Sequence, residues 1–310
     1  MAIETFRTLI SRNRRNSAIL LVAFGAVFVG IGLLIGEVWG GGDIAFRLGV
    51  PLGAAALAFF LALGTYYGGD SVLLAMSKAR EVRKEDDPQL LNVVEELCIA
   101  GGMPMPRIYL IDDSAMNAFA TGRDPAHAAI AVTTGLREKL NRDELQGVVG
   151  HELSHVRHRD ILFATLVAVL VGTLVILCDV FLRSVGWGAY GRSRRGRDGG
   201  GGARLILLLV GLVLAIIAPI LAKIIEMAIS RQREFLADAG SVELTRNPEG
   251  LARALAKISE DPEILEVANR ATAPLYIIHP IKRFEDRAES IFDTHPPVRE
   301  RIQRLLQLTH

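Results

Sequence analysis

The stretch His151-Glu152-Leu153-Ser154-His155 lies where a polar segment runs directly into a long apolar one. On an α-helix, residues i and i+4 lie one turn apart on the same face, so both imidazoles can reach one metal ion beside Glu152. Asn141, with Glu144 three residues later, predicts a capped start for this helix near Arg142. The stretch therefore predicts a zinc-binding helix suited to metal-assisted hydrolysis.

The chain of 310 residues contains an unusually large share of apolar residues. Half of the residues are hydrophobic and the mean hydropathy is +0.32, although only 6% are aromatic. The formal net charge of +1 indicates neither a nucleic-acid partner nor a strongly acidic one. Cys98 and Cys178 form no disulfide framework, which is compatible with a reducing compartment.

Four uncharged apolar runs account for the excess: residues 17–36, 48–69, 161–178 and 205–222. The first two reach the length of about 20 residues that spans a bilayer core, and the last two just reach the minimum. Buried core helices, or a cleaved signal peptide for the first run, are the alternatives. We expect a multi-pass membrane protein with about four transmembrane helices, arranged as two hairpins.

Basic residues beside these runs predict the orientation in the membrane. With the N-terminus inside, eleven flanking basic residues lie in the cytoplasm and seven lie outside. Six of the seven belong to the arginine- and glycine-rich loop 183–204, which conflicts with the tendency of basic residues to lie on the cytoplasmic side. A shallow second hairpin that does not cross the membrane would remove the conflict. Either arrangement leaves the histidine motif on the cytoplasmic side.

The polar segments predict an α+β, mainly α, cytoplasmic domain with a small antiparallel sheet. Short apolar stretches bounded by turn residues predict the strands, at 107–111, 115–121 and 127–132. Helical spacing or a proline at a helix start predicts the helices, at 88–100, 248–259, 262–269 and 296–308. The predicted organisation is an N-terminal hairpin (1–77), a second hairpin (161–229), and a soluble domain in two parts (78–160 and 230–310).

A third metal ligand is needed beyond the two histidines. His158 lies on much the same helix face as His151 but about 10 Å along the axis, too far for a common zinc ion. His155 lies just before the third apolar run, and Glu234 lies just after the fourth. If these two runs form a hairpin, both residues lie at its base, close to each other. Asp238, one turn beyond Glu234, is placed to orient a liganding histidine or to form a surface salt bridge.

Two motifs in this arrangement resemble the HtpX-type membrane zinc endopeptidases, which are related to the CAAX prenyl-protein endopeptidases. They are His151-Glu152-Leu153-Ser154-His155 and Arg233-Glu234-Phe235-Leu236-Ala237-Asp238. The resemblance covers nearly the whole chain and implies a gluzincin-like catalytic domain. It implies that His151, His155 and Glu234 bind one Zn²⁺ and that Glu152 is the catalytic base.

The resemblance also implies roles for two other segments. The first, Asn117-Ala118-Phe119-Ala120, corresponds to an edge strand that binds substrate. From the residues alone it is either an ordinary strand or an edge that pairs with an extended peptide. The second is His295-Pro296, whose histidine is either a helix cap or a donor to the oxyanion. His279-Pro280 is a rival with the same dipeptide.

The function implied by the resemblance is quality control in the bacterial inner membrane. The enzyme would hydrolyse misfolded or damaged membrane proteins on the cytoplasmic side, as part of a stress response. Its partners would be protein substrates and the lipid bilayer, with no nucleic acid. Two alternatives stay open: a CAAX-type prenyl-protein endopeptidase, and a non-enzymatic membrane scaffold or holdase with a structural zinc.

Overall fold

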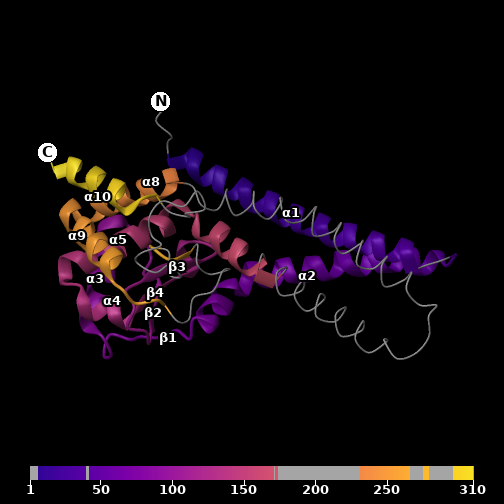
Figure 1. Cartoon of the computed structure of the whole chain (residues 1–310), viewed down its shortest axis with the longest axis horizontal. Coiled ribbons are helices and arrows are strands. Elements are labelled where there is room, and N and C mark those ends of the chain that lie inside the picture. The colour runs from indigo at the N-terminus through magenta and orange to yellow at the C-terminus, as the bar shows by residue number, and fades with distance from the viewer. Residues whose placement is uncertain are drawn as a thin grey trace. The chain divides into compact units, whose positions relative to one another are not determined.

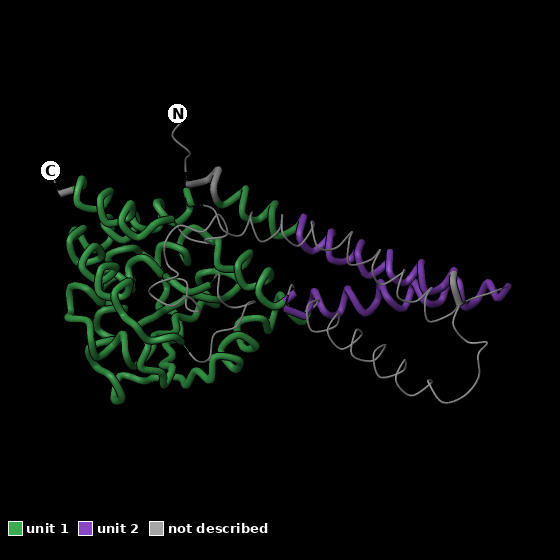
Figure 2. Tube along the Cα trace, viewed as in Figure 1, with its two compact units in different colours: residues 1–18, 64–169, 228–310 green, residues 19–63, 170–227 purple. Residues whose placement is uncertain are grey.

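The computed structural model describes residues 6–39, 42–170, 172–173, 231–265, 275–278 and 296–309. Most of the third apolar run's second half, the arginine-rich loop and the whole fourth run lie outside the described residues, as do His279 and His295. The chain divides into two compact units (Figure 2). Unit 1 comprises Met1–Ala18, Gly64–Val169 and Ala228–His310, and unit 2 comprises Ile19–Leu63 and Leu170–Met227.

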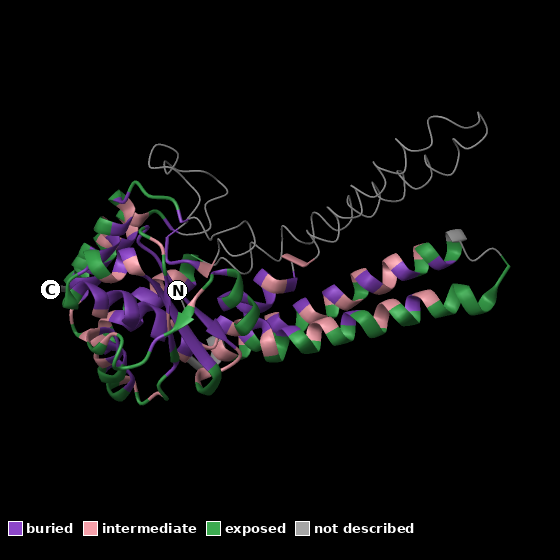
Figure 3. Cartoon of the chain, turned by 90° about the horizontal axis from the view of Figure 1, so that it is seen from below, coloured by how far each residue is buried: buried purple, intermediate pink, exposed green. Residues whose placement is uncertain are grey.

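Helices α1 (Phe6–Trp39) and α2 (Ile44–Met76) contain the first two predicted spans. Both are long and apolar enough to cross a membrane, by length and composition. Figure 3 shows many residues of both helices as exposed or half-buried, and the large apolar side chains of Leu52, Phe59 and Phe60 are each more than 60% exposed. Such surfaces are stable in lipid and unfavourable in water. Within unit 2, Gly32 lets α1 lie directly against the backbone of Pro51 in α2.

Unit 1 contains a four-stranded mixed sheet in the order β1-β2-β4-β3 (Figure 1). Its strands are β1 (Arg80–Glu81), β2 (Arg107–Ile111), β3 (Ala118–Gly122) and β4 (Ala128–Thr133). The prediction of an antiparallel sheet is wrong at β2 and β4, which pair in parallel. The chain passes from β2 to the far edge, forms β3, and returns by a tight turn, so that β4 enters between them. β3 is therefore an edge strand, as predicted.

Helices cover the sheet of unit 1. They are α3 (Pro88–Gly101), α4 (Thr134–Lys139), α5 (Arg142–His158), α8 (Arg231–Thr245), α9 (Pro248–Glu260) and α10 (Val298–Leu306), with 3-10 turns η1 (Pro125–His127) and η4 (Gln307–Thr309). The predicted helix at 262–269 is wrong over its described part, residues 262–265, which is not helical. There Asp261 has extended backbone and its carboxylate accepts a hydrogen bond from the Met116 N–H at 2.8 Å.

The motif helix α5 begins as its sequence predicts and then packs closely on α8. Asn141 and Glu144 form a reciprocal capping box at its first turn. Further along, a Cβ atom on Gly240 of α8 would collide with the Ser154 hydroxyl of α5. The Ser241 hydroxyl donates to the Gly147 carbonyl at 2.7 Å. Because glycine and serine line this contact, the two helix backbones approach closely enough for their side chains to meet in one site.

Candidate metal centre

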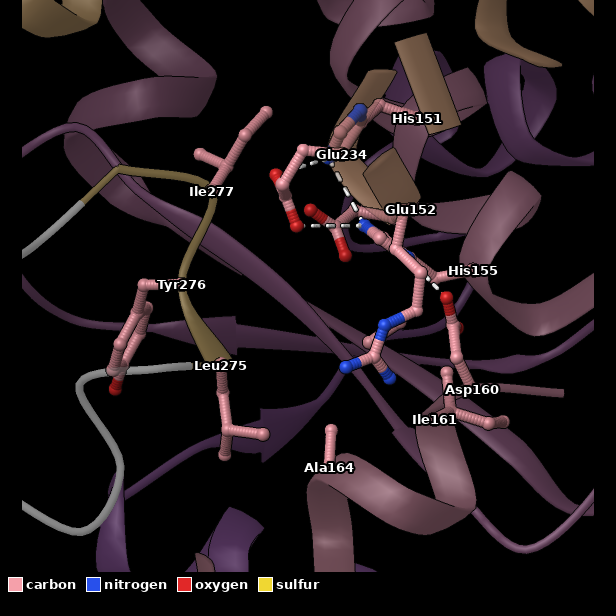
Figure 4. Close-up of a pocket in the computed structure, with 12 residues that line it drawn as sticks. His151, Glu152, His155, Asp160, Ile161, Ala164, Glu234, Leu275, Tyr276 and Ile277 are labelled. Atoms are coloured by element: carbon pink, nitrogen blue, oxygen red, sulfur yellow. Dashed lines mark hydrogen bonds and ion pairs between the residues drawn. The ribbon is translucent and has the colours of Figure 1, made fainter. Parts of the chain in front are cut away.

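Helices α5 and α8 bring His151, His155 and Glu234 together in unit 1 (Figure 4). The two imidazole Nε2 atoms are 3.1 Å apart. The Glu234 carboxylate lies 3.7 Å from the Nε2 of His151 and 3.8 Å from that of His155. The structure therefore unites the three residues that the sequence proposes as metal ligands.

The geometry of these three groups fits a small divalent cation. Ligand atoms bonded to zinc at about 2.0–2.1 Å in a tetrahedron lie about 3.3 Å from one another. The observed separations of 3.1, 3.7 and 3.8 Å lie close to that value. Two imidazoles and a carboxylate are also the ligand set of many catalytic metal sites that keep one position open. The residues present can hold a metal ion without rearrangement of the backbone.

Each of the two histidines has its second ring nitrogen, Nδ1, beside a carboxylate. Asp238 Oδ1 lies 2.9 Å from His151 Nδ1, and Asp160 Oδ2 lies 2.9 Å from His155 Nδ1. A carboxylate at Nδ1 holds the proton on that atom and leaves Nε2 free to bind a metal. Asp238 thus takes the orienting position proposed from sequence. Asp160 is an equivalent partner that the sequence analysis missed.

Arg301 of α10 is the second residue that the sequence analysis missed. Its side chain is fully buried, and it binds both oxygens of Asp238 at 2.6 and 2.9 Å. It also lies 3.3 Å from His151 Nδ1 and 3.6 Å from Glu234. A sequence signal exists, because Arg301 lies within the apolar stripe of α10 that includes Val298 and Leu305. A charged residue inside an apolar stripe indicates a buried partner.

Glu152 lies on the same helix turn with its carboxyl group buried. Burial raises its pKa to about 7, with a smaller contribution from the negative charge of Glu234. A carboxyl group with a pKa near neutrality can accept and release a proton at physiological pH. Burial lowers the pKa of His151, which favours the neutral imidazole that a metal ion binds.

A small cavity of about 50 Å³ lies beside these groups. Its lining includes Glu152, the β3 residue Ala120, and Ile161 and Ala164, which follow α5 in the chain. The opposite wall is formed by residues 275–277, as Figure 4 shows. We call residues 275–278 the strap. Of the predicted substrate segment Asn117-Ala118-Phe119-Ala120, Ala120 lines the cavity together with Glu152, while His295 lies outside the described residues.

A helix with two histidines four residues apart, a glutamate beside them and a carboxylate from a second helix defines the metallopeptidase class of site. Residues 84–309 match the sequence model of Peptidase family M48, and the chain belongs to that family. The predicted resemblance to HtpX-type proteins is confirmed, since relatives with that name match over 96–100% of the chain. Family and helices together make the protein a membrane peptidase.

Two curated relatives illustrate the match. The "Protease HtpX homolog" of Thermoanaerobacter pseudethanolicus is 44% identical over 100% of both chains. The protein of the same name from Dictyoglomus thermophilum is 42% identical over 97% of this chain and 94% of that one. Among solved structures, Ste24p of S. mikatae has a TM-score of 0.47 and 17% identity, covering 96% of this chain and 66% of that one. The family assignment rests on the sequence relatives.

Proposed function

We propose that this protein is a zinc-dependent endopeptidase of the bacterial inner membrane, with its catalytic groups in the cytoplasm. Its substrates are misfolded or damaged membrane proteins. The observation that carries the proposal is the meeting of His151, His155 and Glu234 within 3.8 Å of one another beside the buried Glu152. The proposed ligands are these three, with one zinc ion per chain.

Zinc bound by these ligands would polarise the scissile carbonyl group and lower the pKa of water to about 7. Glu152 takes a proton from the attacking water as the new C–O bond forms. It then gives that proton to the amine as the C–N bond breaks. Its pKa of about 7 suits both transfers. His295 is the proposed donor to the oxyanion.

The remaining charged groups of the site position the ligands. Asp238 and Asp160 hold the imidazoles of His151 and His155 in the required orientation. Arg301 in turn holds Asp238 through two charge-assisted hydrogen bonds. The peptide backbone of a substrate pairs with the outer edge of β3, at residues 117–120, so that binding needs no particular substrate sequence.

The number of ligands distinguishes this proposal from a scaffold with a structural zinc. Structural zinc sites are normally closed by four protein ligands, whereas catalytic sites use three. Within the described ranges, three ligand side chains meet here. A CAAX-type prenyl-protein endopeptidase remains the other proposal, and a prenylated peptide as substrate separates it from the first.

The test uses purified full-length protein in detergent, loaded with zinc. The Glu152→Gln variant should retain zinc but cleave casein about 10²–10⁴-fold more slowly than the wild-type protein, because it lacks the proton acceptor. Cleavage of a membrane-protein fragment should fall equally. A variant that cleaves both substrates at the wild-type rate would rule out the proposed role of Glu152.

A further inference from the structure

The outer side of the edge strand β3 already carries hydrogen bonds to another segment of the chain. β3 is buried at all five residues although it lies at the edge. The strap, residues 275–278, follows its outer side. The Ile277 N–H donates to the Ala118 carbonyl at 3.1 Å, and the Asn117 side-chain amide donates to the Ile278 carbonyl at 3.0 Å. The strap therefore uses the same backbone and amide groups that the proposed function assigns to a substrate.

A single aromatic residue anchors the strap. Tyr276 is fully buried, and its ring meets that of Phe119 edge to face at a centroid distance of 5.2 Å. Its hydroxyl lies 3.4 Å from that of Ser77. Leu74 and Ile111 complete the apolar cluster around the ring. Removing this ring therefore removes the aromatic contact between the strap and β3 and weakens the attachment of the strap.

The strap is also attached to the metal centre. The Ile277 carbonyl accepts a hydrogen bond from Arg301 Nη1 at 3.1 Å, and Arg301 binds Asp238 with its other nitrogens. With the strap in place, the cavity beside Glu152 is about 50 Å³. That volume holds a few water molecules.

We infer that the strap is an internal competitor that occupies the substrate position on β3 in the resting enzyme. This inference rests on the proposed function, in which β3 binds substrate. An extended peptide can pair with Ala118 only after Ile277 releases it, because the carbonyl faces one neighbouring chain at a time. The protein would thus be inhibited by its own chain until a substrate displaces residues 275–278.

Internal competition has a defined kinetic signature. Only molecules with a free β3 edge bind substrate. The apparent affinity is therefore the affinity of the open enzyme multiplied by the fraction of molecules whose edge is free. At saturating substrate the strap is displaced, and kcat is that of the open enzyme. A strap that was merely structural would instead support the site, and its loss would lower kcat.

The test compares Tyr276→Ala with the wild-type protein, full length and zinc-loaded, using β-casein as the probe. We expect KM to fall about tenfold with kcat unchanged, if the edge is free in about one molecule in ten. Tyr109→Ala is the matched control. It removes the same side chain from β2 at the margin of the same apolar cluster, where its hydroxyl accepts a hydrogen bond from Arg107. KM unchanged or raised in a Tyr276→Ala protein with full zinc content overturns the inference.

A second measurement needs no change in the strap and no cleavage. In the Glu152→Gln protein, hydrogen exchange at Ile277 should be slow without casein and should accelerate when β-casein binds. Casein binding is followed separately by fluorescence anisotropy, so a failure of peptidase activity and a failure of the strap give different results. Slow exchange at Ile277 with casein bound, or no casein binding at all, counts against the strap as a competitor.

Discussion

The cavity is bounded on one side by charged side chains of α5 and α8, which α10 supports through Arg301, and on the other by β3 and the strap. On the first side each charged group has a specific partner, as Asp238 has Arg301 and His151. On the second side the contacts are backbone hydrogen bonds and apolar packing around Phe119.

The difference concerns what each side can tolerate. A buried charge that loses its partner keeps its desolvation cost, so changes on the charged side should have large effects. Backbone groups are the same in every residue, and apolar packing adjusts to similar side chains. Changes on the strand side should therefore be small and graded. The predictions below test this contrast in order of decreasing effect.

The largest effect is expected for Glu234→Ala, which removes one of three proposed ligands. Zinc per chain, measured by elemental analysis, should fall close to zero, and casein cleavage should fall by about 10³-fold or more. Glu243→Ala is the control on the same helix, since Glu243 forms a surface pair with Arg157. Undiminished zinc in Glu234→Ala would remove Glu234 from the site.

The next effect is expected for Arg301→Ala, which leaves Asp238 buried without its cation. We expect a loss of about 3–5 kcal/mol in the free energy of unfolding, measured by denaturant titration in detergent. Arg301→Lys should lose less but not be neutral, because an ammonium group cannot bind both carboxylate oxygens. Arg299→Ala, at an exposed position of α10, should be near neutral. Equal losses for Arg301→Ala and Arg299→Ala would contradict the proposed role.

A smaller effect is expected for Asp160→Asn, which keeps the shape of the side chain but removes its charge. The Nδ1 of His155 would lose a carboxylate partner at 2.9 Å. Zinc affinity, measured by competition with a chelator, should fall about 10–100-fold. Asp143→Asn, at an exposed position in the first turn of α5, should leave zinc affinity unchanged. An Asp160→Asn protein with wild-type zinc affinity would show that Asp160 does not support His155.

The smallest effect is expected for Phe119→Leu on the strand side. The change removes the ring contact with Tyr276 but keeps an apolar side chain of similar size. We expect a loss of about 1 kcal/mol in the free energy of unfolding. Zinc content should stay at the wild-type value. A loss of zinc in this variant would erase the contrast between the two sides.

Local sequence signals predicted the elements that carry the ligands. The capping pair Asn141 and Glu144 marked the start of α5, and the structure confirms it. Histidines one turn apart share a face on any regular helix, so His151 and His155 were predictable as a pair. Glu234 required one further step, the assumption that an apolar hairpin brings its two ends together.

The parts that sequence analysis missed depend on contacts between distant segments. Arg301 lies 63 residues from Asp238, and its role follows only from the packing of α10 against α8. β2 and β4 pair in parallel because β4 lies between β2 and β3 in the sheet. The alternation of apolar residues along a strand does not encode this strand order. The strap had no local signal, since its residues do not differ from an ordinary apolar stretch.

By itself, the sequence determined the helix that bears the motif, the two apolar N-terminal helices and the identity of the three proposed ligands. Those features follow from periodicity, capping and length, which act over a few turns of one helix. Only the tertiary structure decided that Asp160 and Arg301 lie beside the candidate ligands and that residues 275–278 form hydrogen bonds with Asn117 and Ala118 at the edge of the sheet. Buried charges and strand edges are satisfied by whichever segment packs against them, and that choice is made by the whole fold.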